Sequence, residues 1–304
     1  MRFPLRAALA LLALILIAPL AFADQCASSR SNLPSYSELT KIFSYNQKAP
    51  LHLKRLSSTE KDGVTIQSIE FMIGAKQPCS ARLAIPQQRG PLPAVIWLGS
   101  GDKDWTPYAL EFSKLGAISL VPDNCGNAPA SDARGFYNDE VRAVIELRRG
   151  VDVLLARDDV DPKRIAFVGH SGGAMLGADA VAVDGRFKAA VFESGLQGFT
   201  YHICSSPHPY AVNIREELGD ALPDFVATLA PLDAILYIAH EAPTALLFQS
   251  ARLDKGVPPS DAQAFFDAAS QPKQIIWYDG GHEMKLPQVS KDRNEFLKRQ
   301  LAMP

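Results

Sequence analysis

The sequence predicts an α/β fold built on a mostly parallel twisted sheet, with antiparallel N-terminal strands and a helical lid insertion. Three observations carry this prediction. Short apolar runs, typical of strands buried on both faces, alternate with helical periodicity from residue 94 onward. Alternating or β-branched runs precede residue 94, which indicates antiparallel strands. Residues 196–242 interrupt the alternation with aromatic residues, prolines and helical turns, which is typical of a lid.

Residues 1–23 have the pattern of a secretory signal peptide. Arg2 and Arg6 precede an apolar run over residues 7–20, and a small-x-small cleavage pattern ends at Ala23. The apolar run is short for a membrane span, so we expect cleavage after Ala23 rather than anchoring. The protein is therefore expected in the periplasm or outside the cell, with no membrane span in the mature chain.

The charge of the mature chain narrows the class of partner. Removal of Arg2 and Arg6 leaves 29 basic and 33 acidic residues, a formal charge of −4. No basic block stands out, so we expect no nucleic-acid partner. The polar, Ser-rich residues 24–45 are expected to form an arm over the main domain, which spans residues 46–304.

The elements of the main domain follow from local pattern. The runs 51–54, 64–72 and 81–85 are separated by turn residues and predict an antiparallel meander. Continuous apolar runs then predict buried strands, and the segments between them have an apolar face at helical spacing. The expected strands are 94–98, 117–121, 165–168, 189–192, 245–248 and 274–278, and the expected helices are 105–115, 138–156, 174–183, 259–269 and 289–301.

The four cysteines are too far apart in the sequence to form a CxxC motif. Two disulfides are expected in an oxidising compartment, and four cysteines allow three pairings. We favour Cys26 with Cys79, near the start of the mature chain, and Cys125 with Cys204, between two loops beside the proposed site. Buried thiols are the alternative.

The stretch from Arg164 to Gly177, RIAFVGHSGGAMLG, contains the motif G-x-S-x-G between an apolar strand and a helix of small residues. Glycines at positions 169 and 173 let the helix pack closely enough for an abrupt turn. Ser171 is then held out over a helix N-terminus, where an acyl-transfer nucleophile is needed. A serine that only caps the helix is the structural alternative.

A serine hydroxyl needs a base to take its proton, and the base needs an acid to orient it. His282 lies just past the last expected strand, behind two glycines, and is the expected base. Asp254 follows the preceding strand, in a turn before a helix, and is the expected acid. Glu193, at the end of the strand after Ser171, is the reserve acid.

The developing oxyanion needs backbone N–H donors. Gly172 directly follows the nucleophile and is expected to supply one of them. The loop after residues 94–98 is expected to supply the other, from Ser100 or, as second choice, from Gly101. This chemistry requires no metal or organic cofactor.

The order Ser171, Asp254, His282 on an alternating chain resembles the α/β-hydrolase superfamily, and most closely its dienelactone hydrolase-like and prolyl-oligopeptidase-like serine hydrolases. Besides the G-x-S-x-G stretch, the resemblance is carried by VDPKRI at 160–165, VPDNCG at 121–126 and WYDGGH at 277–282. It covers about residues 46–303 and implies the α/β-hydrolase fold. Dienelactone hydrolases proper have a cysteine at the position of Ser171, so lactone specificity is not implied. Prolyl-oligopeptidase relatives carry a propeller domain that is absent here, so peptidase activity is not implied either.

The sequence therefore predicts an exported serine hydrolase that cleaves a small-molecule carboxylic ester through an acyl-enzyme. A peptidase or amidase on the same residues is the alternative, with Tyr201, Arg215 and the pair Glu216–Glu217 as candidate anchors for a peptide terminus. A binding protein on a hydrolase fold is a further alternative.

Overall fold

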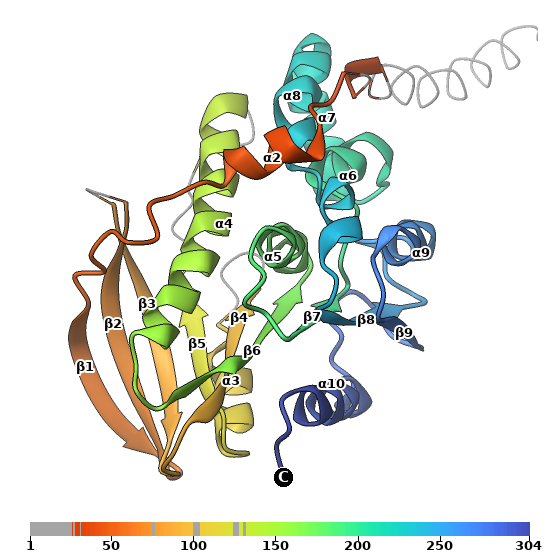
Figure 1. The fold of residues 1–304 in the computed structure, drawn as a ribbon. Helices are drawn as coiled ribbons and strands as arrows, with labels where there is room; N and C mark the ends of the chain where they lie inside the picture. Colours follow the sequence, from red (N-terminus) through yellow and green to blue (C-terminus); the bar gives the residue numbers. More distant parts are fainter. Residues whose placement is uncertain are drawn as a thin grey trace, which may run out of the picture.

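Nine strands in the described part of the chain form one mixed sheet, in the order β1-β2-β3-β5-β4-β6-β7-β8-β9 (Figure 1). The computed structural model describes residues 26, 28–30, 32–74, 77–99, 104–123, 128–129 and 132–304. Strands β1, β2 and β3 pair antiparallel, β3 pairs antiparallel with β5, and the remaining pairs are parallel. The predicted α/β class with antiparallel N-terminal strands is confirmed. The strands are β1 (Lys54–Lys61), β2 (Val64–Gly74), β3 (Gln77–Pro86), β4 (Leu92–Leu98), β5 (Ile118–Pro122), β6 (Val160–His170), β7 (Ala189–Glu193), β8 (Ala245–Ala251) and β9 (Lys273–Tyr278).

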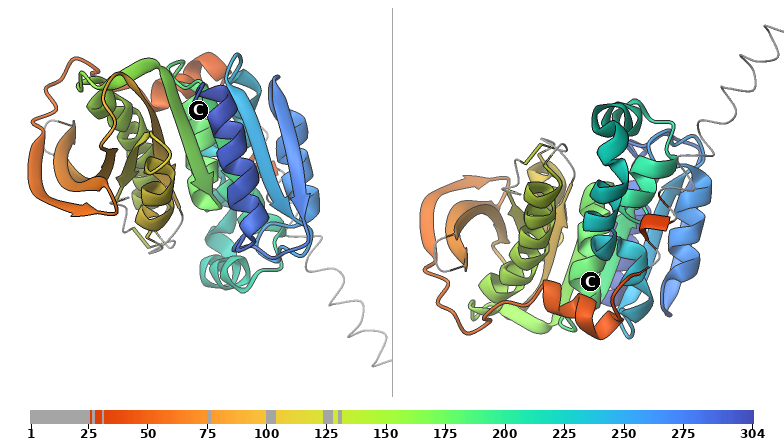
Figure 2. Two further views of the ribbon diagram at one scale, coloured as in Figure 1. Left: turned by 90° about the horizontal axis from the view of Figure 1, so that it is seen from below. Right: turned by 90° about the horizontal axis from the view of Figure 1, so that it is seen from above.

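Helices cover both faces of this sheet. Helices α4, α5 and α9 lie on one face, whereas α3 and α10 lie on the other (Figure 2). On the first face, Phe192 of β7 and Phe248 of β8 pack against Phe265 of α9. On the second, Trp97 of β4 packs against Phe112 of α3. The helices are α2 (Tyr36–Ile42), α3 (Thr106–Ser113), α4 (Ala133–Leu155), α5 (Gly172–Ala182), α6 (Phe199–Ser205), α7 (Pro209–Leu218), α8 (Leu222–Leu229), α9 (Pro259–Ala268) and α10 (Pro287–Gln300).

The central strands are buried on both faces, which is why their sequences are continuous apolar runs. Every residue of β4, β5, β7 and β8 is buried. Because neighbouring parallel strands end at the same edge of the sheet, the residues that follow β4, β6, β8 and β9 are brought together there.

The first strand lies later in the chain than the sequence pattern indicates. Residues 51–54 were expected to be a strand, but β1 begins at Lys54 and runs to Lys61. All residues of β1 are exposed, because this strand forms the edge of the sheet and pairs with β2 alone. An edge strand without a buried face needs no apolar alternation, so the pattern does not reveal it. Leu51 instead packs against the core from an extended segment.

The expected insertion consists of α6, α7, α8 and four short 3₁₀ turns between β7 and β8. Helices α6, α7 and α8 are grouped at one end of the molecule in Figures 1 and 2. Phe225 of α8 packs against Phe136 of α4, so the insertion is attached to the body through apolar contacts. Residues Pro209–His240 are apolar enough in composition to span a membrane, but the stretch is broken into short helices, and 56% of its most apolar window is buried in the protein.

The disulfide pairing differs from both favoured pairs. Cys26 is bonded to Cys204 of α6, so a bond of either to Cys79 or Cys125 is excluded. Their sequence separation is 178 residues, and only the return of the insertion to the arm brings them together. Cys79 is buried on β3, where its thiol donates to the Glu146 carboxylate at 2.6 Å. Cys125 and the predicted signal peptide, residues 1–23, lie outside the described residues.

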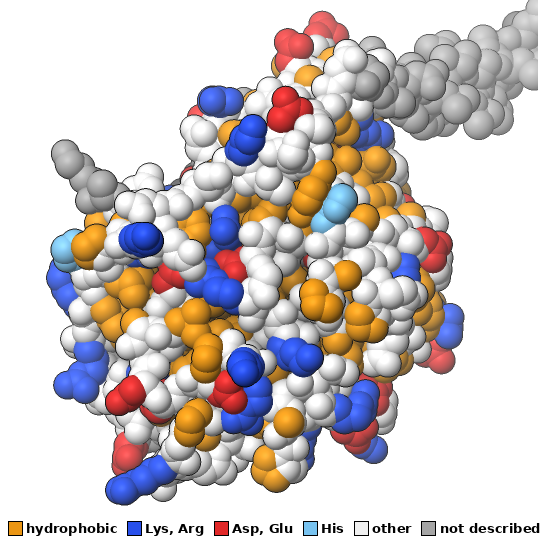
Figure 3. All heavy atoms as spheres, in the orientation of Figure 1, with side chains coloured by type: hydrophobic (Ala, Val, Ile, Leu, Met, Phe, Trp, Pro, Cys, Tyr) orange, Lys and Arg blue, Asp and Glu red, His pale blue; other side chains and the backbone are white. Residues whose placement is uncertain are grey.

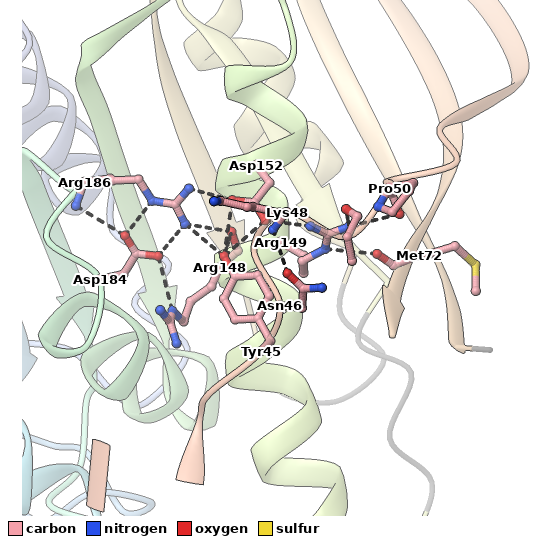
Figure 4. Close-up of polar contacts among 11 residues, drawn as sticks. Tyr45, Asn46, Lys48, Pro50, Met72, Arg148, Arg149, Asp152, Asp184 and Arg186 are labelled. Atoms are coloured by element: carbon pink, nitrogen blue, oxygen red, sulfur yellow. Dashed lines mark hydrogen bonds and ion pairs between the residues drawn. The ribbon is translucent and has the colours of Figure 1, made fainter. Parts of the chain in front are cut away.

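A network of arginines and aspartates ties the segment after α2 to the body (Figure 4). Arg149 of α4 is almost fully buried and donates to the carbonyls of Met72 and Ala49, and to Asp152. Asp152 also accepts from Arg186 at 2.6 Å. On the face drawn in Figure 3, basic and acidic side chains are interspersed rather than segregated by sign.

Candidate active site

Ser171 lies at the abrupt turn between β6 and α5. Its backbone has φ 56° and ψ −124°, a conformation that costs energy for a residue with a Cβ. Its N–H donates to the carbonyl of Glu193 on β7 at 2.9 Å, and its own carbonyl accepts from the N–H of Ala174 and of Met175. The same residue therefore ends the sheet ladder and begins the helix.

Two glycines permit this turn. A Cβ on Gly173 would lie 2.4 Å from the carbonyl oxygen of Leu98, at the end of β4. A Cβ on Gly169 would lie 2.6 Å from the carbonyl oxygen of Gly173. Helix α5 thus packs directly on the ends of two strands, which leaves no room for a side chain at either position.

The structure brings Ser171, His282 and Asp254 into one hydrogen-bonded line. Nε2 of His282 lies 2.9 Å from Oγ of Ser171. Nδ1 of the same ring lies 3.0 and 2.9 Å from the two carboxylate oxygens of Asp254. Asp254 follows β8 and His282 follows β9, so both approach Ser171 from the carboxyl edge of the sheet.

Asp254 is held as a carboxylate. Burial by itself would raise its pKa, but the hydrogen bond to His282 and the backbone N–H groups of Val257 and Gly256 lower the pKa below its ordinary value. The loop lies close under the imidazole, because a Cβ on Gly256 would come 2.9 Å from Nδ1 of His282. An ionised acceptor at Nδ1 leaves Nε2 to take a proton from the serine.

The reserve acid has a different partner. The carboxylate of Glu193 accepts from Arg293 of α10 at 2.7 Å, and both side chains are buried. The guanidinium also lies over the ring of Trp97, 5.1 Å from its centroid. Glu193 is therefore committed to the sheet–helix interface, and Asp254 is the carboxylate that reaches His282.

The sequence reasoning missed two side chains that hold His282 in place. Nε2 of His170 lies 2.8 Å from the backbone carbonyl oxygen of His282, and the Ser194 hydroxyl donates to the same oxygen at 3.2 Å. The His170 ring also packs against Trp105. For His170, the sequence offers one indication of such a role. It lies inside the G-x-S-x-G motif directly before Ser171, so its side chain points away from the serine and is free to contact another loop.

One of the expected oxyanion donors can be located. Gly172 is the first residue of α5, where backbone N–H groups have no partner within the helix, and it lines a cavity together with Ser171. Gly99, at the end of β4, lines the same cavity. Ser100 and Gly101 lie outside the described residues.

A cavity of about 440 Å³ opens over Ser171 and His282. Its walls come from the start of α4, from α5, from the insertion and from the loop after Asp254. The apolar side chains of the wall include Met175, Leu176, Leu196 and Val257, and the polar or aromatic ones are Phe136, Glu140, Phe199, His202, His208 and Tyr210. A volume in this range suits a small organic molecule.

Two polar groups of this wall have strongly shifted pKa values. Burial, followed by the neighbouring His208 and His282, lowers the pKa of His202 to about 4, so the ring is neutral at pH 7. Burial, followed by the charges of Asp139 and Asp233, raises the pKa of Glu140 to about 8. Within the described residues, no group of three or more His, Cys, Asp or Glu side chains is arranged to hold a metal ion.

Comparison with known proteins shows what this chain is similar to. A sequence profile of the prolyl oligopeptidase family matches residues 107–302. Among solved structures, an acetyl xylan esterase from Paenibacillus sp. R4 is similar with a TM-score of 0.74 and 21% identity, over 91% of this chain and 98% of that one. A glucuronoyl esterase from Solibacter usitatus is similar with a TM-score of 0.61 and 14% identity, over 87% and 91%. A puromycin-hydrolyzing peptidase of Mycobacterium tuberculosis is similar with a TM-score of 0.61 and 15% identity, over 85% of this chain but 49% of that one. No curated protein matches significantly in sequence.

The close packing at Gly173 predicts that even one methyl group is not tolerated there. Gly173→Ala would force its Cβ against the Leu98 carbonyl, and we expect a loss of roughly 1–3 kcal/mol in the free energy of unfolding. Gly185→Ala is the matched control, because a Cβ at Gly185 meets no atom within 4 Å. Urea unfolding of both variants measures the difference; equal stabilities would contradict the packing.

The raised pKa of Glu140 predicts a pH dependence of stability. The folded protein keeps this proton up to about pH 8, whereas the unfolded chain releases it near pH 4. The free energy of unfolding contributed by this group therefore falls as the pH rises through this interval. We expect Glu140→Gln to lose less stability than the wild type between pH 5 and pH 8, as measured by urea unfolding at each pH. An unchanged pH slope in the variant would show that Glu140 titrates normally.

Proposed function

Because the chain belongs to the prolyl oligopeptidase family and is a serine hydrolase, we propose that it cleaves carboxylic esters through an acyl-enzyme on Ser171. The observation that carries this proposal is the 2.9 Å contact between Nε2 of His282 and Oγ of Ser171. On the far side of the ring, Asp254 accepts from Nδ1. A nucleophile, a base and an orienting acid are the three groups that acyl transfer by a serine triad uses.

In the first half of the reaction, Oγ of Ser171 attacks the acyl carbon while His282 takes the hydroxyl proton. Asp254 stabilises the imidazolium that forms and keeps Nε2 directed at the serine. The protonated His282 then gives its proton to the alcohol that leaves, and the acyl group remains on Ser171 as an ester. A water molecule, deprotonated by the same ring, attacks this ester. The intermediate then breaks down to the carboxylic acid, and His282 returns the proton to Oγ of Ser171.

The negative oxygen of each tetrahedral intermediate needs donors that are already in position. We assign the N–H of Gly172 to this role, because it begins α5 beside the nucleophile and carries the positive end of the helix dipole. The second donor is proposed to be Ser100 or Gly101, in the loop that follows Gly99. His170 is proposed as a positioning residue, which keeps the loop of His282 at the correct distance.

Two observations favour ester hydrolysis over peptide hydrolysis: the lengths of the similar proteins and the contacts of the candidate peptide anchors. This chain accounts for nearly the full length of the two similar esterases but for half of the similar peptidase. Of the candidate anchors for a peptide terminus, Arg215 is occupied, since it donates to the carbonyls of Ile203 and Ser206. Tyr201 lies under the guanidinium of Arg30. These contacts leave neither side chain directed at a substrate.

Replacing the nucleophile tests the mechanism. We expect Ser171→Ala to lower kcat/KM for p-nitrophenyl acetate by roughly 10⁴-fold or more, with no loss in the free energy of unfolding. A fluorophosphonate probe should label the wild type on Ser171 and leave the variant unlabelled. Ser205→Ala is the control, since the Ser205 hydroxyl is exposed and bonds to the carbonyl of Tyr201. Turnover retained in Ser171→Ala would refute the mechanism, and aminoacyl anilides cleaved faster than acyl esters would identify a peptidase.

We also propose that the protein is exported. The predicted signal peptide and the disulfide between Cys26 and Cys204 support this, because disulfides persist in oxidising compartments. Mass spectrometry of the protein from its native host should find an N-terminus at Asp24. A cytoplasmic protein that retains Met1 would exclude export.

A further inference from the structure

One side of the cavity over Ser171 combines a carboxyl group with three aromatic rings. Glu140 lies on α4 one helical turn after Phe136, so both side chains occupy the same face of the helix. Phe136 packs against Phe199 of α6, with 4.5 Å between ring centroids. Phe199 in turn contacts Tyr210 of α7, with 6.4 Å between centroids. We call Phe136, Phe199 and Tyr210 the aromatic frame; all three line the cavity together with Glu140.

The aromatic frame and the carboxyl group are close neighbours. The charge of Glu140 acts on the Tyr210 hydroxyl and, after burial, is the second cause of the raised pKa of that hydroxyl. By itself, this carboxyl group keeps its proton near pH 7. A cation beside it would meet a group that can ionise into a counter-ion and aromatic rings whose electron-rich faces attract cations.

Two further carboxyl groups lie behind this wall, and burial raises the pKa of both. Asp233 and Asp179 lie close enough to Glu140 for their charges to interact, and both are buried. Arg30 acts on Asp233, but Glu140 and Asp179 form no ion pair with any described residue. One oxygen of Asp179 has no hydrogen-bond partner in the described structure.

The neighbouring groups supply no cation for Glu140. His202 is neutral, for the reasons given above, and Arg215 is turned toward backbone carbonyls. Asp139, next to Glu140 on α4, is paired with Arg142 at 3.1 Å. Among the described residues that line the cavity there is no lysine or arginine.

We propose that this cavity selects esters that carry an ammonium group, with Glu140 as the counter-ion and the aromatic frame as the cation–π partner. This inference rests on the proposed ester hydrolysis at Ser171. A cation placed beside Glu140 favours release of the carboxyl proton and pairs with the carboxylate that forms. A neutral substrate of the same shape fills the same volume but leaves the carboxyl group protonated and the aromatic frame without a charged partner.

Isosteric ester pairs test this selection directly, since each pair differs only in one nitrogen cation against one carbon. For a cation on the alcohol side, acetylcholine is compared with 3,3-dimethylbutyl acetate. For a cation on the acyl side, ethyl 4-(trimethylammonio)butanoate is compared with ethyl 5,5-dimethylhexanoate. We expect the cationic member of at least one pair to have a kcat/KM on the order of tenfold higher.

Variants assign the preference to its residues. Glu140→Gln keeps the shape of the side chain and should bring the ratio of kcat/KM values close to one. Glu295→Gln makes the same replacement at an exposed position on α10 and should leave the ratio unchanged. Because each ratio is measured on one preparation, a smaller folded fraction in a variant does not alter it.

The outcomes separate this inference from the proposed function. Equal rates within both pairs, or turnover of p-nitrophenyl acetate with neither cationic ester hydrolysed, would overturn the selection and leave the esterase intact. A preference that survives in Glu140→Gln would overturn the assignment to Glu140. Failure to hydrolyse any ester, p-nitrophenyl acetate included, would overturn the proposed function, and the inference with it.

Discussion

The close contact between α5 and the end of β4 is the constraint on which the site depends. Gly173 lies against the Leu98 carbonyl, and this allows the chain to turn from strand to helix within one residue. The turn holds Ser171 at a positive φ, with its hydroxyl directed at the carboxyl edge of the sheet. It also places the first N–H groups of α5 beside that hydroxyl. The positions of the proposed nucleophile and of the proposed oxyanion donor therefore follow from one packing contact.

The parallel sheet supplies the other components through its topology. Because β8 and β9 run parallel to β6, the loops that follow them end at the same edge as Ser171. The loop after β8 carries Asp254 and the loop after β9 carries His282. His170, which directly precedes Ser171, then holds the loop after β9 in place through the backbone carbonyl of His282. Strand pairing thus keeps three residues that are distant in the sequence close together at one edge of the sheet.

Much of this arrangement could be predicted from the sequence, since it depends on local pattern. The buried strands are continuous apolar runs, and the motif around Ser171 requires a strand before it and a helix after it. His282 and Asp254 could be singled out because each follows a strand of the parallel sheet. The edge strand β1 could not be located correctly, because an exposed strand carries no apolar alternation. The sequence does not exclude Glu193 beside Asp254 as the acid, because the pairing of Glu193 with Arg293 depends on the packing of α10 against β7.

The sequence by itself determined the class of fold, the order of the catalytic candidates along the chain and the residue at the turn, because these depend on local patterns of neighbouring residues. The tertiary structure decided which cysteines meet, since Cys26 and Cys204 approach only when the insertion returns to the arm. It also decided what surrounds the nucleophile. Glu140 and the aromatic frame come from helices on either side of α5, so their placement in one cavity depends on packing between distant segments, which no local pattern records.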